Sequence, residues 1–293
     1  MLHLLRQRHH DHTDHHHDGH DDHGGLHRDL SATGAALGRR EMLRRFAFGT
    51  GALALLGCGD SGTSVLTGSE SSSETGGTGS TSGTGSTCSK IPTETAGPYP
   101  GDGSNGANVL NQTGVVRSDI RSSFAGLAGT ATGVPLTIKL TLVSASTCTP
   151  LAGRAVYLWH CDALGRYSLY TAGVTNQNYL RGVQEADVNG VVTFTSIYPG
   201  CYSGRWPHVH FEVYPTLASS TSVSNKIATS QIALPKSSND LVYASSGYTS
   251  SAANASQISL ASDNVFSDGS ALELATVTGS VGAGFVATLT VAA

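Results

Sequence analysis

The chain has 293 residues with a formal net charge of -4, and only 13% of its residues are charged. Proteins that bind nucleic acid normally carry a clustered basic surface, so this charge balance excludes nucleic acid as an expected partner. The length allows for an N-terminal targeting region and one domain with a substantial core.

The first 57 residues are typical of an export signal. Residues 3–27 hold ten histidines interleaved with aspartates, and a basic segment at 39–45 leads into an apolar run from Phe46 to Leu56. A basic region before an apolar run too short to span a bilayer indicates a signal peptide, and paired arginines at this place are typical of twin-arginine export. We therefore expect an exported protein, in the periplasm or at the cell surface. The histidine tract is assigned no function.

The end of this signal resembles a bacterial lipobox, Leu55-Leu56-Gly57-Cys58. On that interpretation Cys58 is the lipidated first residue of the mature protein and tethers it to a membrane face. The alternative is an ordinary signal peptide cut nearby. Residues 58–90 are rich in Ser, Gly and Thr and cannot bury enough apolar surface to offset chain entropy, so they are expected to form a linker. Residues 91–293 remain as one catalytic domain.

Four further cysteines follow the linker, and in an oxidising compartment disulfides persist. They are Cys88, Cys148, Cys161 and Cys201. Four cysteines allow three full pairings, and the spacing does not choose among them. We expect structural cysteines.

The domain reads as β-rich. Residues 136–143 alternate apolar and polar side chains, as expected for a strand with one buried face. Residues 155–159, 191–194, 209–214 and 284–291 are further strand-like runs, separated by turn clusters at 150–153 and 187–190. Helical patterns are limited to a short turn near 238–244. Short strands at this spacing predict an all-β sandwich with few short helices.

Beyond the signal, the chain keeps three histidines: His160, His208 and His210. His208 and His210 are two residues apart in a predicted strand, so both imidazoles lie on one face and can reach a common metal ion. Glu212 follows on the same face. A zinc or copper site with Glu212 or His160 as a third ligand is therefore open, as is the simpler reading of two ordinary histidines.

Tyrosine offers a different ligand set. Tyr202 stands six residues before His208, and Tyr167 follows the strand-like run at 155–159. A phenol with a pKa near 10 is deprotonated at neutral pH only when a strong Lewis acid holds it, so two tyrosinate ligands imply a hard, highly charged ion. Iron(III) fits, because two phenolates and one hydroxide balance its charge and leave the histidines as neutral donors.

Four ordered blocks of sequence resemble the intradiol ring-cleavage dioxygenases, a family that includes protocatechuate 3,4-dioxygenase and a group of exported intradiol-like proteins. The blocks are Trp159 to Tyr167, Leu180 to Gln184, Tyr198 to Tyr202 and Arg205 to His210, and the similarity covers roughly residues 91–235. Four blocks in order are far more specific than one His-x-His. The resemblance implies a β-sandwich of transthyretin-like topology.

The resemblance also implies a reaction. A non-haem Fe(3+) would be bound by Tyr167, Tyr202, His208 and His210. A catechol would chelate the metal and displace Tyr202, O2 would attack the ring, and cleavage between the two hydroxyl-bearing carbons would give a muconate-type diacid. Arg205 would stabilise developing negative charge, with Gln231 near the oxygen pocket.

The same resemblance suggests how the substrate is bound. The segment 92–99 matches one that lines the family's pocket, which makes Thr95, Pro98 and Tyr99 candidate substrate-binding residues. In some members a partner subunit supplies it, so we consider a homo-oligomer in which it acts in trans. Arg181 and Gln184 are expected to hold the loop and turn. The alternative function is a β-sandwich binding module with a structural metal and no turnover.

Overall fold

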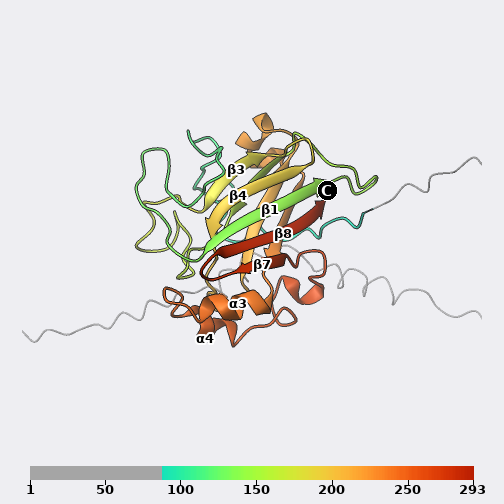
Figure 1. Ribbon diagram of the computed structural model, residues 1–293. Helices are drawn as coiled ribbons and strands as arrows, with labels where there is room; N and C mark the ends of the chain where they lie inside the picture. The colour runs from blue at the N-terminus through green and yellow to red at the C-terminus, as the bar shows by residue number, and fades with distance from the viewer. Residues whose placement is uncertain (1–87) are drawn as a thin grey trace, which may run out of the picture.

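Two four-stranded sheets pack face to face in the computed structural model, which describes residues 88–293 (Figure 1). One sheet has the order β4-β1-β8-β7 and the other β3-β2-β5-β6; β1 and β8 are parallel, and the other neighbours are antiparallel. The strands are β1 Pro135–Val143, β2 Ala155–Trp159, β3 Arg181–Glu185, β4 Val191–Ile197, β5 His208–Tyr214, β6 Ala228–Ala233, β7 Thr276–Ser280 and β8 Gly284–Ala292. The predicted all-β sandwich is confirmed.

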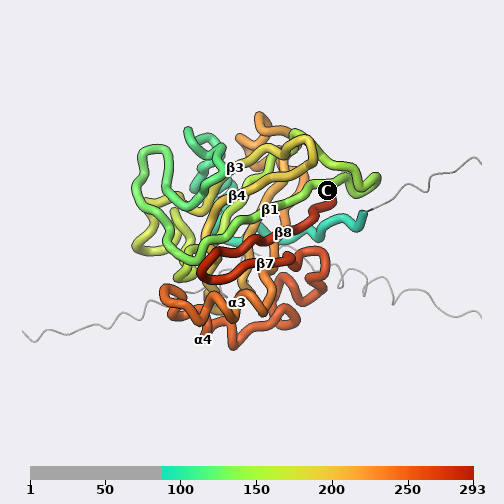
Figure 2. Tube along the Cα trace, viewed as in Figure 1, coloured from blue at the N-terminus to red at the C-terminus, as the bar shows by residue number. Residues whose placement is uncertain are grey.

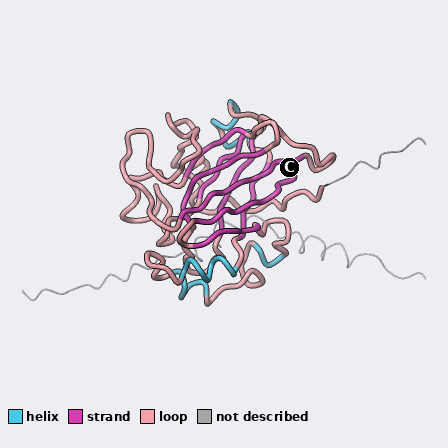
Figure 3. Tube along the Cα trace, viewed as in Figure 1, coloured by secondary structure: helices cyan, strands magenta, loops and turns pink. Residues whose placement is uncertain are grey.

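The helices of the described residues are short and lie at the periphery of the strands (Figure 3). They are α3 Lys236–Tyr243, α4 Ser251–Ala255 and the 3-10 turns η1 Ala218–Thr221, η2 Val223–Asn225 and η3 Phe266–Asp268. The helical turn expected near 238–244 lies in α3, beside α4 at one end of the sandwich (Figure 1). Within residues 88–293, none of the helices is both long and apolar enough to cross a bilayer.

Strand β1 shows why the alternating pattern forms a half-buried strand. Leu136, Ile138 and Leu140 are at most 1% exposed, whereas Lys139 between them is exposed. Successive side chains of a strand point to opposite faces, so this pattern commits one face to the interior of the sandwich.

The other sheet is covered on both faces. Every residue of β2 and of β5 is buried. Val209 and Phe211 of β5 join the core between the sheets, whereas Tyr157 and Trp159 of β2 belong to a second apolar cluster. That second cluster includes side chains from residues 109–124 and from the loop after β2, which together cover the outer face. Polar residues on this face are therefore enclosed without lying in the main core.

The start of the described chain is fastened to its end. Cys88 and Cys148 form a disulfide, and the Ile91 amide donates to the Ala292 carbonyl at 3.0 Å. Figure 2 shows the blue-green start of the domain running close to the C-terminus. Cys161 and Cys201 are buried free thiols, so only one bridge forms among the four cysteines. The predicted signal peptide, Cys58 and nearly all of the linker lie outside the described residues.

Candidate metal centre

One row of residues crosses the outer face of the second sheet. Arg181, Trp159, His210 and Gln231 occupy opposite positions on β3, β2, β5 and β6. His208 lies two residues before His210 and therefore shares this face, as the sequence predicted. The sheet thus presents the histidine pair to the space enclosed by the covering loops.

Four donor atoms meet above this row. His208 Nε2 lies 3.1 Å from His210 Nε2, 3.4 Å from the Tyr167 hydroxyl and 3.3 Å from the Tyr202 hydroxyl. Tyr167 comes from the loop after β2, and Tyr202 from the loop between β4 and β5. The structure therefore brings together all four metal ligands that the family resemblance implied, from three separate segments.

The hydrogen bonding of His208 decides which of its two ring nitrogens is unprotonated and can offer a lone pair to the cluster. Its Nδ1 lies 2.5 Å from the Trp206 carbonyl oxygen, which can only accept, so Nδ1 carries the proton. Nε2 then has one lone pair facing three polar neighbours. Trp159 stacks on the His210 ring with centroids 5.0 Å apart and an interplanar angle of 3°, which holds that imidazole in place.

This donor set fits a metal ion. Donors bonded at about 2.0 Å to a shared ion lie about 3.3 Å apart in a tetrahedral arrangement, and the three distances from His208 Nε2 run from 3.1 to 3.4 Å. A single lone pair cannot accept hydrogen bonds from all three neighbours at once. A cation at the centre would satisfy the four donors together.

Burial sets the charges of these groups. It lowers the pKa of His208 and of His210 well below the usual 6.5, with a smaller contribution from the positive charge of Arg205. Burial also raises the pKa of Tyr167 well above 10. The imidazoles are therefore neutral donors at neutral pH, and Tyr167 keeps its proton unless a strong Lewis acid replaces it.

The alternative third ligands for zinc or copper do not join this cluster. Glu212 is on the expected face, but its carboxylate pairs with Lys226 at 2.8 Å and accepts from the Tyr214 hydroxyl at 2.7 Å. His160 contacts Ser196 Oγ and the Cys161 carbonyl, each at 2.7 Å. Within residues 88–293, no group of three or more His, Cys, Asp or Glu side chains is arranged to hold a metal. Glu212 and His160, the alternative third ligands left open by the sequence, therefore have other partners in this structure.

Arg205 is held rigidly beside the cluster. Its side chain is 1% exposed; Nε donates to Asp263 at 3.0 Å and Nη2 to Gln231 Oε1 at 2.7 Å. Gln231, itself fully buried, donates onward to the Thr95 carbonyl at 2.9 Å. Asp263 also accepts from the Trp206 amide at 2.7 Å, so one buried carboxylate fixes both the guanidinium and the backbone before His208.

The segment predicted to line the substrate pocket lies over the same site. The rings of Tyr99 and Tyr167 have centroids 4.9 Å apart, and the Glu94 amide donates to the Thr229 carbonyl of β6 at 2.9 Å. A Cβ on Gly97 would lie 3.4 Å from His210 Cε1. Pro98, between Gly97 and Tyr99, accepts from Asn105 at 2.5 Å. In this structure the chain supplies the segment to its own site.

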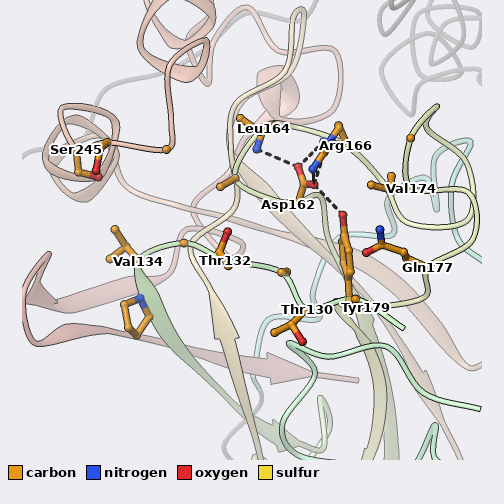
Figure 4. Close-up of a pocket in the computed structure, with 18 of the residues that line it drawn as sticks. Thr130, Thr132, Val134, Asp162, Leu164, Arg166, Val174, Gln177, Tyr179 and Ser245 are labelled. Atoms are coloured by element: carbon orange, nitrogen blue, oxygen red, sulfur yellow. Dashed lines mark hydrogen bonds and ion pairs between the residues drawn. The ribbon is translucent and has the colours of Figure 1, made fainter. Parts of the chain in front are cut away.

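A buried carboxylate also shapes the loop that carries Tyr167. Asp162 accepts from the amides of Leu164 and Arg166 and from the Arg166 Nε and Tyr179 hydroxyl, at 2.9 to 3.0 Å (Figure 4). These residues line a cavity of about 770 Å³, whose lining includes none of the four candidate ligands. The cavity therefore borders the loop that carries Tyr167 but is separate from the four donor atoms.

This chain is similar to a known protein family and to solved structures. A family model described as a dioxygenase matches residues 115–220, which include the four candidate ligands. The structure of an intradiol ring-cleavage dioxygenase from Tetranychus urticae superposes with a TM-score of 0.56 at 24% identity, covering 70% of this chain and 94% of that one. The fold is therefore that of an intradiol ring-cleavage dioxygenase, and residues 115–220 are similar to a dioxygenase family. The resemblance stated from the sequence is confirmed.

Two further structures are more distant. The dioxygenase domain of a carbohydrate-binding fusion protein from Streptomyces sp. SirexAA-E gives a TM-score of 0.45 at 20% identity, covering 70% of this chain and 98% of that one. A 3-chlorocatechol 1,2-dioxygenase from Rhodococcus opacus 1CP gives 0.43 at 15%, covering 68% and 71%. Comparison with curated proteins gave no match.

Sequence reasoning missed two residues that build this site. Asp263 lies 58 positions from Arg205, and no local motif connects them. Trp159 was noted only as a strand residue, although its alternation with Leu158 already placed it on the face opposite the main core. The first could only be found from the folded chain, whereas the second could have been inferred from strand parity.

Proposed function

We propose that this protein is a non-haem iron(III) dioxygenase that opens a catechol-type ring between its two hydroxyl-bearing carbons, with O2, to give a muconate-type diacid. The observation that carries the proposal is the meeting of two phenol oxygens with two imidazole nitrogens around His208 Nε2, at 3.1 to 3.4 Å. Two phenolates and two neutral imidazoles suit a hard trivalent ion.

Iron(III), when bound, would withdraw electron density from a chelated catecholate so that the ring reacts directly with oxygen. His208 and His210 are the fixed ligands in this proposal. Both are buried on β5, and both are held by neighbours, His208 by the Trp206 carbonyl and His210 by the Trp159 ring.

The two tyrosines differ in a way that assigns them different roles. Tyr167 is 1% exposed, whereas Tyr202 is only partly buried. In this proposal Tyr202, the more exposed of the two, would be the ligand that an incoming catechol displaces, as the family resemblance implies. Its released phenolate oxygen can take one of the two catechol protons, which a neutral phenol could not do. Tyr167 stays in place.

Arg205 acts through its charge. Its guanidinium is oriented by Asp263 and Gln231 before any substrate binds, so no side-chain reorganisation is needed when negative charge develops on the ring oxygens. Gln231 also bonds to the Thr95 carbonyl, which connects the guanidinium to the segment covering the site.

The proposal extends to location. The paired arginines at 39–40 and 44–45, the apolar run after them and the lipobox-like Cys58 support export, with the domain tethered by a lipid at Cys58. When the producing cells are grown with a radiolabelled fatty acid, the label should become attached to the wild-type protein. Cys58→Ala should remain unlabelled.

The test uses the iron-loaded mature domain with a panel of substituted catechols, following oxygen uptake and identifying the products. Intradiol products are expected. The loaded protein should be coloured by tyrosinate-to-iron charge transfer, and Tyr167→Phe and Tyr202→Phe should each shift that absorption band, while Tyr243→Phe, outside the site, should leave it unchanged.

Extradiol products would contradict the reaction. A colourless protein with full iron occupancy would contradict the ligand set. Catechol binding without oxygen consumption by the coloured protein would favour the binding module instead.

A further inference from the structure

Arg181 is a buried cation that the proposed reaction does not use. Arg181 is the first residue of β3, and its side chain is fully buried. No carboxylate of the described residues forms an ion pair with it. Burying a guanidinium is unfavourable unless every donor is satisfied. The question is what the five N–H groups of this residue hold.

All five donors reach neutral oxygens. Nη1 donates to the Pro100 carbonyl at 2.7 Å and to the Tyr157 hydroxyl at 3.2 Å, and Nη2 to the carbonyls of Tyr99 at 3.0 Å and Ser168 at 2.9 Å. Nε donates to Ser168 Oγ at 3.1 Å. Two of these acceptors, the carbonyls of Tyr99 and Pro100, lie at the end of the pocket-lining segment 92–99 and directly after it, and two belong to Ser168, the residue directly after Tyr167.

The surrounding backbone is shaped for this arrangement. Leu180 and Leu169, next to Arg181 and Ser168, have φ of +56° and +74°, a region that non-glycine residues rarely occupy. At Gly101, a Cβ would lie 2.9 Å from Arg181 Nη1, and φ is +66°, so only glycine fits. Residues keep a strained backbone only where the surrounding contacts hold them in it. Here the two strained residues adjoin Arg181 and Ser168, the two partners of this hydrogen-bonded contact.

We propose that Arg181 is a positioning residue that fastens the end of the pocket-lining segment 92–99, with the adjoining residues 100 and 101, to the loop carrying Tyr167, and so sets the distance between substrate wall and metal ligand. The inference rests on the proposed function in one respect, namely that this segment lines a substrate pocket. The fastening itself concerns only the fold of the chain. None of the hydrogen bonds of Arg181 reaches a donor atom of the four candidate ligands.

The matched control is Arg117. It too is an arginine bonded to backbone carbonyls, those of Arg181, Ile120 and Ser122, but it touches neither the covering segment nor the Tyr167 loop. Arg117→Met therefore removes hydrogen bonds to backbone carbonyls, one of them on β3, without releasing the pocket-lining segment or the Tyr167 loop.

The first measurement is amide hydrogen exchange of the metal-free protein. Arg181→Met should raise exchange in residues 99–101 and 168–170 by tenfold or more, and Arg117→Met should leave both stretches unchanged. Ser168→Ala, which removes one of the five acceptors, should give a smaller increase at 168–170, and it serves if Arg181→Met does not fold. Unchanged exchange in the Arg181 and Ser168 variants, or an equal change in Arg117→Met, would overturn the proposal.

The second measurement separates this proposal from the proposed function. With a catechol that the iron-loaded wild type turns over, Arg181→Met should raise KM about tenfold while kcat falls less, because the substrate wall moves while the ligands remain. If Arg181→Met shows faster amide exchange but the same KM as wild type, the positioning role is overturned. If wild type consumes no oxygen with any catechol, the proposed function fails, and the exchange result alone still decides whether Arg181 fastens the two segments.

Discussion

At the residue scale, the site depends on buried polar groups whose partners lie far away in the chain. Asp263 is the clearest case, because it neutralises Arg205 and holds the Trp206 amide at once. His160 is another, since a histidine matching a metal-ligand pattern is instead a satisfied core residue between β2 and β4, bonded to Ser196. In both residues, function or its absence follows from the hydrogen-bond partners.

Asp263→Asn should destabilise the fold and impair Arg205. Leaving a buried guanidinium without its counter-charge costs about 3 kcal/mol of unfolding free energy, measurable by urea denaturation. The matched control is Asp240→Asn, which breaks an exposed pair with Lys236 and should cost less than about 0.5 kcal/mol. Equal losses in the two variants would show that the buried pair has no special weight.

The pH dependence of stability should carry the mark of His160. Burial lowers the pKa of His160 to about 4 from 6.5, so the unfolded chain takes up this proton at higher pH than the folded one does. The contribution of His160 is complete above pH 6.5 and is lost as the pH falls toward 4. Both proteins are compared without metal. Between pH 7 and pH 4.5, the unfolding free energy of wild type should decrease by about 2 kcal/mol more than that of His160→Gln, which has no imidazole to protonate. Parallel curves would exclude this origin.

At the element scale, the strands predicted from alternation are those with a strong apolar face. The runs at 136–143, 155–159, 191–194, 209–214 and 284–291 correspond to β1, β2, β4, β5 and β8. The strands missed were β3, β6 and β7, all at sheet edges. Their sequences are rich in polar residues, because β3 and β6 carry Arg181 and Gln231 under the covering loops and β7 is largely exposed.

The turn before Tyr167 offers a test of how elements position ligands. Gly165 has φ of +79°, and a Cβ there would lie 3.0 Å from Tyr202 Cβ. Gly165→Ala should cost about 1 kcal/mol for the left-handed backbone and also shift the tyrosinate absorption of the iron-loaded protein. Gly153→Ala, with φ of +75° and open space around its Cβ, should show the same stability loss with an unchanged spectrum. A spectral change in both would point to a general backbone effect.

At the scale of the whole molecule, one sheet supplies the histidines and loops from distant parts of the chain enclose them. The covering segment enters beside the C-terminal strand, where the Cys88–Cys148 disulfide closes a loop of 60 residues. This bridge restricts the unfolded chain and fixes where the covering segment begins.

Replacing both cysteines, in Cys88→Ser with Cys148→Ser, should lower the unfolding free energy by about 4 kcal/mol, since a loop of this length loses much chain entropy when closed. Denaturant unfolding with and without reductant measures this. Reductant should lower the stability of wild type but leave the double variant unchanged. An effect of reductant on the variant would implicate Cys161 or Cys201.

The sequence by itself determined the sandwich, the shared face of His208 and His210, and a family resemblance strong enough to choose the four ligands. Strand periodicity and contiguous motifs are local properties, so they can be read along the chain. Tertiary structure alone decided that His160 and Glu212 are occupied elsewhere, that Asp263 orients Arg205, and that the chain covers its own site. These depend on partners between 14 and 136 residues apart, and no local pattern encodes such pairings.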